Sequence, residues 1–570
     1  MNRKTLLASG ACAALLLMYP RTLWARAGSR VRPGDARWPS RSAWNALNRR
    51  IGGRLTPVAF PLGNLSTLNN PFYIGDQPGL TENLGWVDAW TSKPSVYAVT
   101  AQDAHDLAAA VDFAREHNLR LVVKGGGHSY QGTSNAPDSL LVWTRRMNGI
   151  TLRDEAVTLG AGNVWLHAYD AVTTKAGRYV QGGGCTTVGV AGLVQSGGFG
   201  SFSKRYGTAA SSLLEAQVVT ADGAVRTANA TTNPDLFWAL KGGGGGTFGI
   251  VSSVTLRLHD LPEYFGAAIA TIKAGSDDAY ARLLRHFVAF YAERLFNSHW
   301  GESVTIRQSN TLAINLVCQG LDSAQIAAVW KPFFDWIARS PRDYRLQGQP
   351  FTGAVPARHW WDGAFWRKEA PQAVSFDPRP GHSNDWWWRG DGDQAGQVLY
   401  GYESLWLRAS LLQDDGQTGL AKALFAASRQ FTFMLHFNKG LAGAPADTLA
   451  AARNTATNPK VLDAFALAIC ADTEGPAYPG MPGHEPDVAA GRKSARAIDR
   501  CVNELRAVAP HGGSYVSESN YFEPDWQHSY WGSNYPRLAA IKKKYDPDGL
   551  FFVHNGVGSE DWSSDGFSKR

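Results

Sequence analysis

Apolar residues follow helical and strand-like patterns that alternate along the first half of the chain. Leu107, Val111 and Ala114 share one helical face in residues 103–117, which is the spacing of an amphipathic helix. Short apolar runs at 96–99 and 121–123 flank this helix and predict strands, so a β-α-β unit opens the folded region. The same reasoning predicts helices at 42–51, 164–176 and 233–240, strands at 139–143, 156–159 and 250–258, and a hairpin at 214–227.

A different pattern begins after Leu261 and Pro262. Strands grouped with long amphipathic helices are typical of an antiparallel sheet covered by helices, and we predict such an α+β domain in this half of the chain. The predicted helices lie at 276–295, 323–339 and 489–508, and the predicted strands at 304–306, 311–317 and 431–437.

Three glycine-rich loops interrupt the first half. They read LVVKGGGHSYQG at 121–132, YVQGGGCTTVGVAGLVQSGGFGSFSKRYG at 179–207, and a glycine run at 242–246. Glycine has no Cβ, so consecutive backbone amides can approach an anion such as a pyrophosphate. The loops lack the strand–GxGxxG–helix order of a Rossmann unit and the lysine of a Walker motif. They therefore indicate a ligand held along the backbone over a considerable length.

The motifs in these loops resemble the berberine-bridge-enzyme-like branch of the vanillyl-alcohol-oxidase superfamily of FAD-linked oxidases. GGGHSY resembles the family loop whose histidine bonds to the flavin 8-methyl group, and GGGCTTVGVAG resembles the loop whose cysteine bonds to flavin C6. Residues 534–551 resemble the family's closing segment. The resemblance covers roughly residues 71–254 and 513–560. It implies an α+β fold, with a two-lobed FAD-binding domain of the vanillyl-alcohol-oxidase (PCMH) type and a substrate domain whose antiparallel sheet is covered by helices.

Pattern and resemblance together divide the chain into five segments. Residues 1–27 are predicted to be a signal peptide, because Arg3 and Lys4 precede an apolar run at 6–18 and a small-x-small cleavage site ends the segment. This predicts a secreted or periplasmic protein with no membrane attachment after cleavage, and an uncleaved anchor is the alternative. The remaining segments are a leader (28–70), the FAD-binding domain (71–260), the substrate domain (261–500) and a C-terminal segment that completes the FAD domain (501–570).

The resemblance implies FAD bound bicovalently through His128 and Cys185. Taken alone, a histidine is more often structural and a cysteine more often a buried thiol, and only the surrounding motifs favour a flavin link. No cysteine or histidine spacing suggests a metal site. The other predicted FAD-binding residues belong to the same three loops and the strand that follows them: Lys124, Gly125, Gly126, Gly127, Ser129, Val188, Gly189, Gly192, Gly197, Gly198, Gly249, Ile250 and Val251.

The resemblance also implies an oxidase, because a valine three residues after the flavin cysteine goes with reaction with O2 in this family, and that position is Val188. The family's Tyr-x-Asn-Tyr motif near the C-terminus is replaced by YVSE at 515–518, so its last tyrosine, part of the usual base, is missing. We predict Glu518 as the catalytic general base, with Tyr521 as the alternative, because a buried carboxylate can abstract a proton directly. A solvated surface glutamate is the competing interpretation.

The substrate prediction depends on the 21 tryptophans, of which two clusters at 359–366 and 384–389 offer flat surfaces for stacking. Together with export they predict a secreted FAD-dependent oxidase that removes a hydride from an alcohol, with an oligosaccharide anomeric C1-OH as first choice and O2 reduced to hydrogen peroxide. Oxidation of a phenolic, alkaloid-like or other secondary-metabolite alcohol or amine is the alternative, and a flavin-binding protein without oxidase activity is a third. The tryptophans could equally be core residues.

The charge balance gives no reason to expect a nucleic-acid partner. The net charge is +7, and removing the four basic residues of 1–27 leaves +3. The expected partners are O2 and a small-molecule or oligosaccharide substrate, and the sequence does not indicate the oligomeric state. Cys470 and Cys501 are the pair that we would test for a disulfide after export, with buried free thiols as the alternative.

Overall fold

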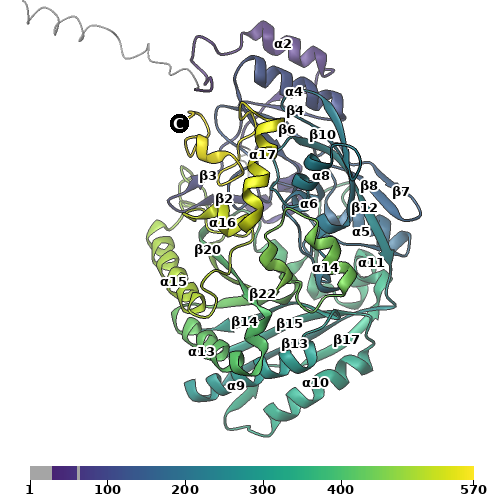
Figure 1. Cartoon of the computed structure of the whole chain (residues 1–570), viewed down its shortest axis with the longest axis vertical. Coiled ribbons are helices and arrows are strands. Elements are labelled where there is room, and N and C mark those ends of the chain that lie inside the picture. The colour runs from purple at the N-terminus through teal and green to yellow at the C-terminus, as the bar shows by residue number, and fades with distance from the viewer. Residues whose placement is uncertain (1–28, 61–64) are drawn as a thin grey trace, which may run out of the picture.

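The computed structural model describes residues 29–60 and 65–570, so the predicted signal peptide at 1–27 lies outside the described residues. The strands form sheets of four, six and ten strands and one two-stranded hairpin. The four- and six-stranded sheets lie in the upper half of the molecule, and most of the ten-stranded sheet lies below them (Figure 1). None of the described helices combines the length and the hydropathy needed to span a lipid bilayer.

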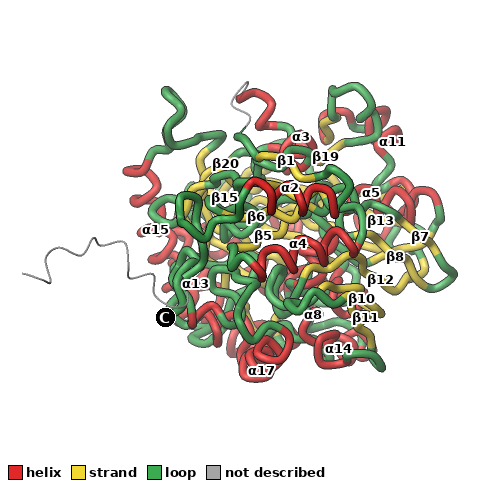
Figure 2. Tube along the Cα trace, turned by 90° about the horizontal axis from the view of Figure 1, so that it is seen from above, coloured by secondary structure: helices red, strands yellow, loops and turns green. Residues whose placement is uncertain are grey.

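The predicted β-α-β unit forms the first sheet. Its strands β4 (Tyr97–Thr100) and β5 (Arg120–Lys124) lie on either side of β6 (Ser139–Trp143), parallel to it, and β1 (Leu55–Pro57) is the antiparallel edge. Helix α4 (Ala104–Glu116) begins after Asp103, whose carboxylate accepts two backbone N–H groups of the first turn. Helix α2 (Arg41–Arg50) packs beside α4 over this sheet (Figure 2). Residues 28–70 therefore contribute a helix and a strand to this lobe.

The second sheet is antiparallel and leads the chain into the other two glycine loops. Strand β12 (Ile250–Asp260) lies between β8 (Ala156–Gly160) and β10 (Leu213–Val219). Strand β9 (Arg178–Val180) pairs with the end of β12 and precedes the second glycine loop, and helix α8 (Pro234–Leu240) precedes the third. The outer strands are β7 (Ile150–Leu152) and β11 (Val225–Asn229), and the predicted helix at 164–176 is α5 (Trp165–Tyr169) extended by the π-helical segment η2 (Asp170–Lys175).

The third sheet confirms the predicted sheet covered by helices. Its order is β16-β13-β15-β14-β21-β22-β20-β2-β3, with β17 beside β13, and every pair is antiparallel except β2 with β20. The strands are β2 (Asn83–Trp86), β3 (Trp90–Thr91), β13 (Tyr264–Ala274), β14 (Trp300–Arg307), β15 (Thr311–Gln319), β16 (Tyr344–Leu346), β17 (Phe351–Pro356), β20 (Gln397–Arg408), β21 (Phe433–His436) and β22 (Ala464–Glu474). The covering helices are α9 (Asp277–Phe290), α10 (Ser323–Ala338), α13 (Asp414–Gln430) and α15 (Val488–Arg506).

The two faces of this sheet pack against different partners. Along β20, Leu405 and Leu407 join the core beneath the helices, whereas Trp406 packs on the opposite face with Phe199 from the second glycine loop. Strand β2 precedes the β-α-β unit in the chain yet belongs to this sheet, so a segment from the first half of the chain joins the sheet of the second half. The face opposite the helices is thereby held against the glycine loops.

The central strands β20 and β22, together with β13 and α13, were not predicted. Every residue of β20 except the last is buried, so the strand shows no alternation of apolar and polar positions. Strand β22 begins with AFALAIC, an apolar run that fits a buried helix as well as a strand. Burial on both faces therefore removes the periodicity on which the prediction depends.

The C-terminal segment returns to the glycine loops, as the resemblance implies. Helix α17 (Tyr535–Tyr545) lies beside α8, and its Lys542 Nζ donates to the carbonyl oxygens of Thr247 and Phe551, both at 2.7 Å. Phe551 pairs with Leu121 of β5, and Arg30 Nη2 donates to the carbonyl oxygen of Leu550 at 3.1 Å. These bonds tie the third glycine loop and the N-terminal residues to the end of the chain.

The expected partners Cys470 and Cys501 lie next to each other as free thiols in the core between β22 and α15. The Cys470 and Cys501 sulfur atoms lie 3.7 Å and 3.9 Å from the carbonyl oxygens of Thr432 and Phe431, respectively. A disulfide between them remains a prediction.

Candidate functional site

A cavity of 1440 Å³ lies where the glycine loops meet the third sheet. Its wall combines all three glycine loops, the sheet face opposite the helices and residues 515–518 of the C-terminal segment. Ligand sites commonly measure roughly 300–1,000 Å³, so this cavity has room for a large cofactor together with a substrate.

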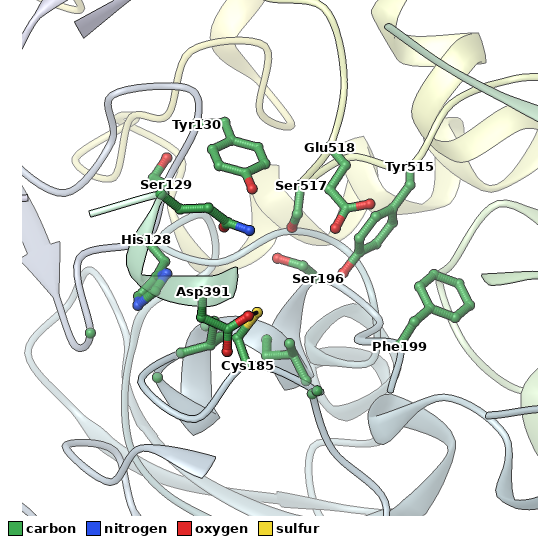
Figure 3. Close-up of a pocket in the computed structure, with 18 of the residues that line it drawn as sticks. His128, Ser129, Tyr130, Cys185, Ser196, Phe199, Asp391, Tyr515, Ser517 and Glu518 are labelled. Carbon is green, nitrogen blue, oxygen red and sulfur yellow. Dashed lines mark hydrogen bonds between the residues drawn. The ribbon is translucent and has the colours of Figure 1, made fainter. Parts of the chain in front are cut away.

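The first two glycine loops touch through their backbones. A Cβ atom on Gly126 would lie 2.7 Å from the backbone nitrogen of Gly189, and a Cβ atom on Gly189 would lie 2.8 Å from that of Gly126. Only glycine allows this approach, because any side chain would push the loops apart. As a result His128 and Cys185, which belong to different loops, both line the cavity (Figure 3).

The His128 imidazole faces two protein groups through one nitrogen. Its Nε2 atom lies 3.1 Å from Thr187 Oγ1 and 3.9 Å from Glu82 Oε2. Burial lowers the pKa of His128 to about 4, so the ring is neutral at ordinary pH. Burial also raises the pKa of the Glu82 carboxyl to about 8, and the nearby Asp391 charge adds to this shift.

The Cys185 thiol has a carboxyl partner of its own. Its Sγ donates to Asp391 Oδ1 at 3.4 Å, from helix α12 (Arg389–Gly392) directly after the second tryptophan cluster. Burial, reinforced by Asp391, raises the pKa of Cys185 well above its ordinary value, and burial raises that of Asp391 to about 7. The two predicted attachment residues are thus each held beside a buried carboxyl group that the sequence did not single out.

The predicted base Glu518 lies in the same cavity, whereas Tyr521 does not. Lys439 Nζ donates to both carboxylate oxygens of Glu518, at 2.6 Å and 2.5 Å. Tyr521 instead stacks on His554 with ring centroids 3.7 Å apart and packs against Trp86. Of the two candidates, only Glu518 is therefore placed where it could contact a bound substrate.

A second carboxyl group near Glu518 carried no signal in the sequence. Glu302 of β14 lines the cavity, accepts from Ser201 Oγ at 2.5 Å and from Asn438 Nδ2 at 3.4 Å, and has a backbone φ of 65°. Burial raises the pKa of this carboxyl group. A positive φ is uncommon for glutamate, and such strain is found where the surroundings hold a side chain in place.

The predicted FAD-binding residues divide into two sets. Those in the cavity wall are Gly125, Gly126, Gly127, His128, Ser129, Cys185, Val188, Gly189, Gly192, Gly249 and Val251. Gly197, Gly198 and Ile250 lie outside the wall, where Ile250 belongs to the core of the first lobe and Gly198 donates its N–H to Tyr515 Oη at 3.3 Å.

Lys124 is a correction to the prediction, because its side chain binds protein and does not reach the cavity. Its Nζ donates to the carbonyl oxygens of Gln77, Pro78 and Leu80 at 2.6, 3.0 and 2.8 Å. Burial lowers the pKa of this ammonium group to about 7. The lysine anchors the segment before β2, and its position next to three glycines gave a false indication of phosphate binding.

Comparison with known proteins decides the family. Residues 95–229 match the FAD binding domain family and residues 514–558 match the berberine and berberine-like family. The chain is 30% identical to the VAO-type flavoprotein oxidase VAO615 of Thermothelomyces thermophilus over 94% of both chains. It is 28% identical to the FAD-linked oxidoreductase ZEB1 of Gibberella zeae over 93% of both chains.

The chain belongs to the VAO-type, berberine-bridge-enzyme-like FAD-linked oxidoreductases. A crystal structure of the VAO-type flavoprotein MtVAO615 from Myceliophthora thermophila matches with a TM-score of 0.73 and 27% identity, covering 94% of this chain and 98% of the other. The carbohydrate oxidase from Microdochium nivale matches with a TM-score of 0.66 and 21% identity, covering 90% and 99%, which shows a shared fold.

The cavity of this FAD-linked oxidoreductase fits the cofactor. Several buried polar atoms in its wall have no hydrogen-bond partner among the residues that the structure describes, including Gln131 Oε1, Gln195 Oε1 and Thr247 Oγ1. Buried polar atoms are rarely unpaired, so a polar ligand is expected beside them. Gly192 also lines the wall, and a Cβ there would meet nothing within 4 Å, so the space beside it is open. The polar wall and open cradle are the features that a long dinucleotide requires.

The tryptophan clusters are partly core and partly cavity wall. Trp386 and Trp387 are buried and lie outside the wall. Trp360, Trp366 and Trp388 are half-buried and line the cavity together with Phe365. Trp361 is both, since it is buried and also lines the cavity, so both interpretations from the sequence apply to these clusters.

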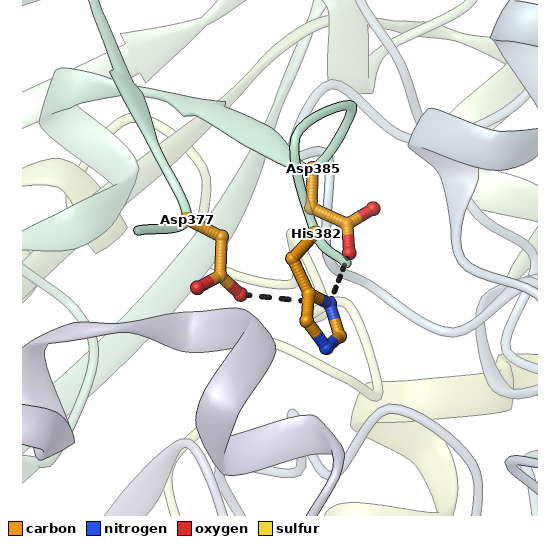
Figure 4. A group of neighbouring side chains, drawn as sticks. All are labelled: Asp377, His382 and Asp385. Carbon is orange, nitrogen blue, oxygen red and sulfur yellow. Dashed lines mark hydrogen bonds and ion pairs between the residues drawn. The ribbon is translucent and has the colours of Figure 1, made fainter. Parts of the chain in front are cut away.

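One group of side chains beside the second tryptophan cluster consists of metal-ligand types. Donor atoms of Asp377, His382 and Asp385 lie within 4.8 Å of one another (Figure 4). Arg379 already donates to both Asp377 oxygens, and its Nη2 donates to Asp76 at 2.7 Å. The Arg379 guanidinium occupies the position beside these carboxylates that a metal cation would need. We therefore interpret the group as an ion-pair network, which holds the hairpin of β18 (Val374–Phe376) and β19 (Trp386–Trp388) against the FAD-binding lobe.

Proposed function

We propose that this FAD-linked oxidoreductase holds its flavin covalently through both His128 and Cys185, and that Glu518 takes a proton from the substrate. The observation that supports this proposal is the presence of these three side chains in the wall of one cavity. When bound, the flavin supplies hydride acceptance, and the protein supplies orientation and proton transfer. The Lys439 ion pair fixes the direction of the Glu518 carboxylate toward the cavity.

The proposed electron acceptor is O2, reduced to hydrogen peroxide. Val188 lines the cavity close to Cys185, and it is the small residue that the family resemblance associates with oxidases. Anaerobic reduction of the flavin followed by mixing with air tests this step. Reoxidation within seconds supports an oxidase, and reoxidation over many minutes contradicts it.

The proposed substrate is an alcohol with an aromatic or otherwise apolar body, such as a phenolic or another secondary-metabolite alcohol. The outer part of the cavity carries Ile269 and Phe351, which face each other on β13 and β17 and are 46% and 53% exposed. With Trp360, Trp366 and Phe365 they form a wide apolar wall on which an aromatic ring could stack.

An oligosaccharide oxidised at its anomeric C1-OH is the second candidate. Gln372, Gln394 and Asp472 also line the cavity and could bond to sugar hydroxyls between the tryptophan rings. A chitooligosaccharide oxidase and the xylooligosaccharide oxidase from Myceliophthora thermophila share the fold, with TM-scores of 0.65 and identities of 18% and 19%. At these identities the likeness concerns the fold alone.

A substrate panel tests the proposal. Hydrogen peroxide release and flavin bleaching are measured with benzylic and phenolic alcohols and with cello-, xylo- and chitooligosaccharides. Bleaching by the aromatic alcohols supports the first candidate, and bleaching only by the sugars favours the second. Bleaching that persists at the wild-type rate in Glu518→Gln would contradict the role of Glu518.

We also propose that the protein is exported and that residues 1–27 are removed. The support is the sequence pattern of that segment alone. The mass of the protein purified from the medium or the periplasm of its native host tests the proposal, because cleavage leaves Gly28 as the first residue.

A further inference from the structure

Glu82 is a buried carboxyl group that the proposed function does not use. It lies just before β2, and its backbone N–H donates to the carbonyl oxygen of Gly127 at 3.0 Å, next to His128. Its own carbonyl oxygen accepts from Gly396 at 2.8 Å. Lys124, through its three bonds to the carbonyl oxygens of residues 77–80, anchors the segment that leads to Glu82. The backbone therefore fixes Glu82 against the loop that carries His128.

The side chain of Glu82 is left without a hydrogen-bond partner at one oxygen. Glu82 is 1% exposed, its Oε2 has no partner among the described residues, and this atom lies 3.9 Å from His128 Nε2. Leaving a buried carboxyl oxygen unpaired costs free energy, and such a group calls for a functional explanation. The His128 imidazole, 3.9 Å away, is a group that could exchange a proton with it.

We propose that Glu82 assists the covalent attachment of the flavin by accepting the proton that His128 must lose. The inference rests on the proposed attachment at His128. Attachment forms a bond between a ring nitrogen and the carbon of the flavin 8-methyl group, and it breaks one C–H bond and the imidazole N–H bond. The two electrons released pass to O2, and O2 combines with the two released protons to give hydrogen peroxide.

The geometry also indicates which ring nitrogen forms the bond. Nε2 is engaged on the protein side by Thr187 and Glu82, so Nδ1 is the nitrogen left for the flavin. The neutral ring then carries its hydrogen on Nε2, and that proton leaves toward Glu82 as Nδ1 forms the bond. Only the ionised carboxylate can accept it, so attachment is expected to accelerate as the pH rises toward about 8, the pKa to which burial raises Glu82. The titratable groups that face this carboxyl are His128, Asp391 and Tyr130.

The test uses the Cys185→Ala background, in which only His128 can retain flavin. The protein is loaded with FAD, precipitated with acid at successive times, and the flavin retained in the pellet is measured across pH 6–9. We expect Glu82→Gln in this background to slow attachment about 100-fold, which is the lower end of a general-base contribution, and to remove the rise with pH. Glu82→Asp should recover part of the rate, and the visible spectrum before precipitation should show that each variant still binds FAD.

Glu403→Gln is the matched control, because Glu403 is also a buried carboxyl, 5% exposed against 1% for Glu82. Burial raises its pKa to about 7, and it lies outside the cavity wall. This control should leave the attachment rate unchanged. Attachment by Cys185→Ala/Glu82→Gln at the rate and pH profile of Cys185→Ala would overturn the role of Glu82. Release of all flavin by Cys185→Ala alone would instead show that His128 forms no bond to the flavin. That result would contradict both the proposed attachment at His128 and the role of Glu82.

Discussion

The cavity wall that carries His128 and Cys185 and the wall that carries Glu518 are built in different ways. The first consists of glycine loops in direct backbone contact, and each loop supplies one reactive side chain. The second brings together Glu518, Lys439 and Glu302 from three distant segments, through the Lys439–Glu518 ion pair and a hydrogen bond from Asn438 to Glu302. In the proposed function, attachment of the cofactor depends on the fit of the loop backbones, whereas proton transfer from the substrate depends on the placement of charged side chains. Substitutions in the two walls should therefore have different effects.

A change at the contact between the two glycine loops is expected to remove the cofactor itself. Gly126→Ala places a Cβ atom 2.7 Å from the backbone nitrogen of Gly189, and backbone cannot move aside as a side chain can. We expect the purified variant to contain at least about tenfold less flavin, since displacement of well-packed backbone costs about 1–3 kcal/mol or more. Gly149→Ala, where a Cβ atom meets nothing within 4 Å, is the control and should retain its flavin.

The opposite behaviour is expected at Glu518. Glu518→Gln should keep its flavin and lower the rate of flavin reduction about 10²–10⁴-fold, because it removes the proton acceptor and leaves the cofactor wall intact. Stopped-flow reduction with the best substrate of the panel measures the effect. Tyr521→Phe is the control, and a similar loss of the reduction rate in that variant would indicate that Tyr521 is the base.

The buried Glu82 carboxyl gives a pH-dependent prediction for the attachment wall. Burial raises its pKa from 4.5 to about 8, so between these values the folded protein binds a proton that the unfolded chain releases. The wild-type apoprotein should therefore lose stability relative to Glu82→Gln as the pH rises from about 4.5 to 8, by a few kcal/mol at most. Thermal unfolding at pH 5 and pH 8 measures this, and an equal difference at both pH values contradicts it.

The smallest expected effect concerns the outer part of the substrate wall. Phe351→Ala should raise KM for an aromatic substrate about tenfold, equal to about 1.4 kcal/mol of lost contact, with little change in kcat. Phe522→Ala removes a ring of similar exposure, 54% against 53%, that lies outside the cavity and should change neither parameter. An unchanged KM in Phe351→Ala would indicate that the substrate does not bind against this wall.

The same difference between the walls explains what could be predicted from the sequence. His128 and Cys185 each lie inside one continuous motif, so the local pattern was sufficient to find them. Lys439 ends the short 3-10 helix η8 (Phe437–Lys439) after β21, and Glu302 lies inside β14. Nothing in the sequence near either residue indicates that Glu518 comes close to them. Glu82 was missed for the same reason, since its partner His128 lies far along the chain.

Burial also decided which helices and strands could be predicted from the sequence. Amphipathic helices such as α9 and α15 were predicted because one face of each is exposed. The strands β20 and β22 at the centre of the third sheet were missed because burial on both faces leaves no alternation. Lys124 was misassigned because the carbonyl groups that bind its Nζ belong to residues 77–80, which only the fold brings around it.

A peptide map of the acid-precipitated, protease-digested holoprotein tests the central claim most directly. The two-anchor arrangement predicts that the pellet stays yellow and that one flavin-bearing species joins the peptide containing His128 to the peptide containing Cys185. A colourless pellet with all flavin in the supernatant, or flavin on neither peptide, would contradict it.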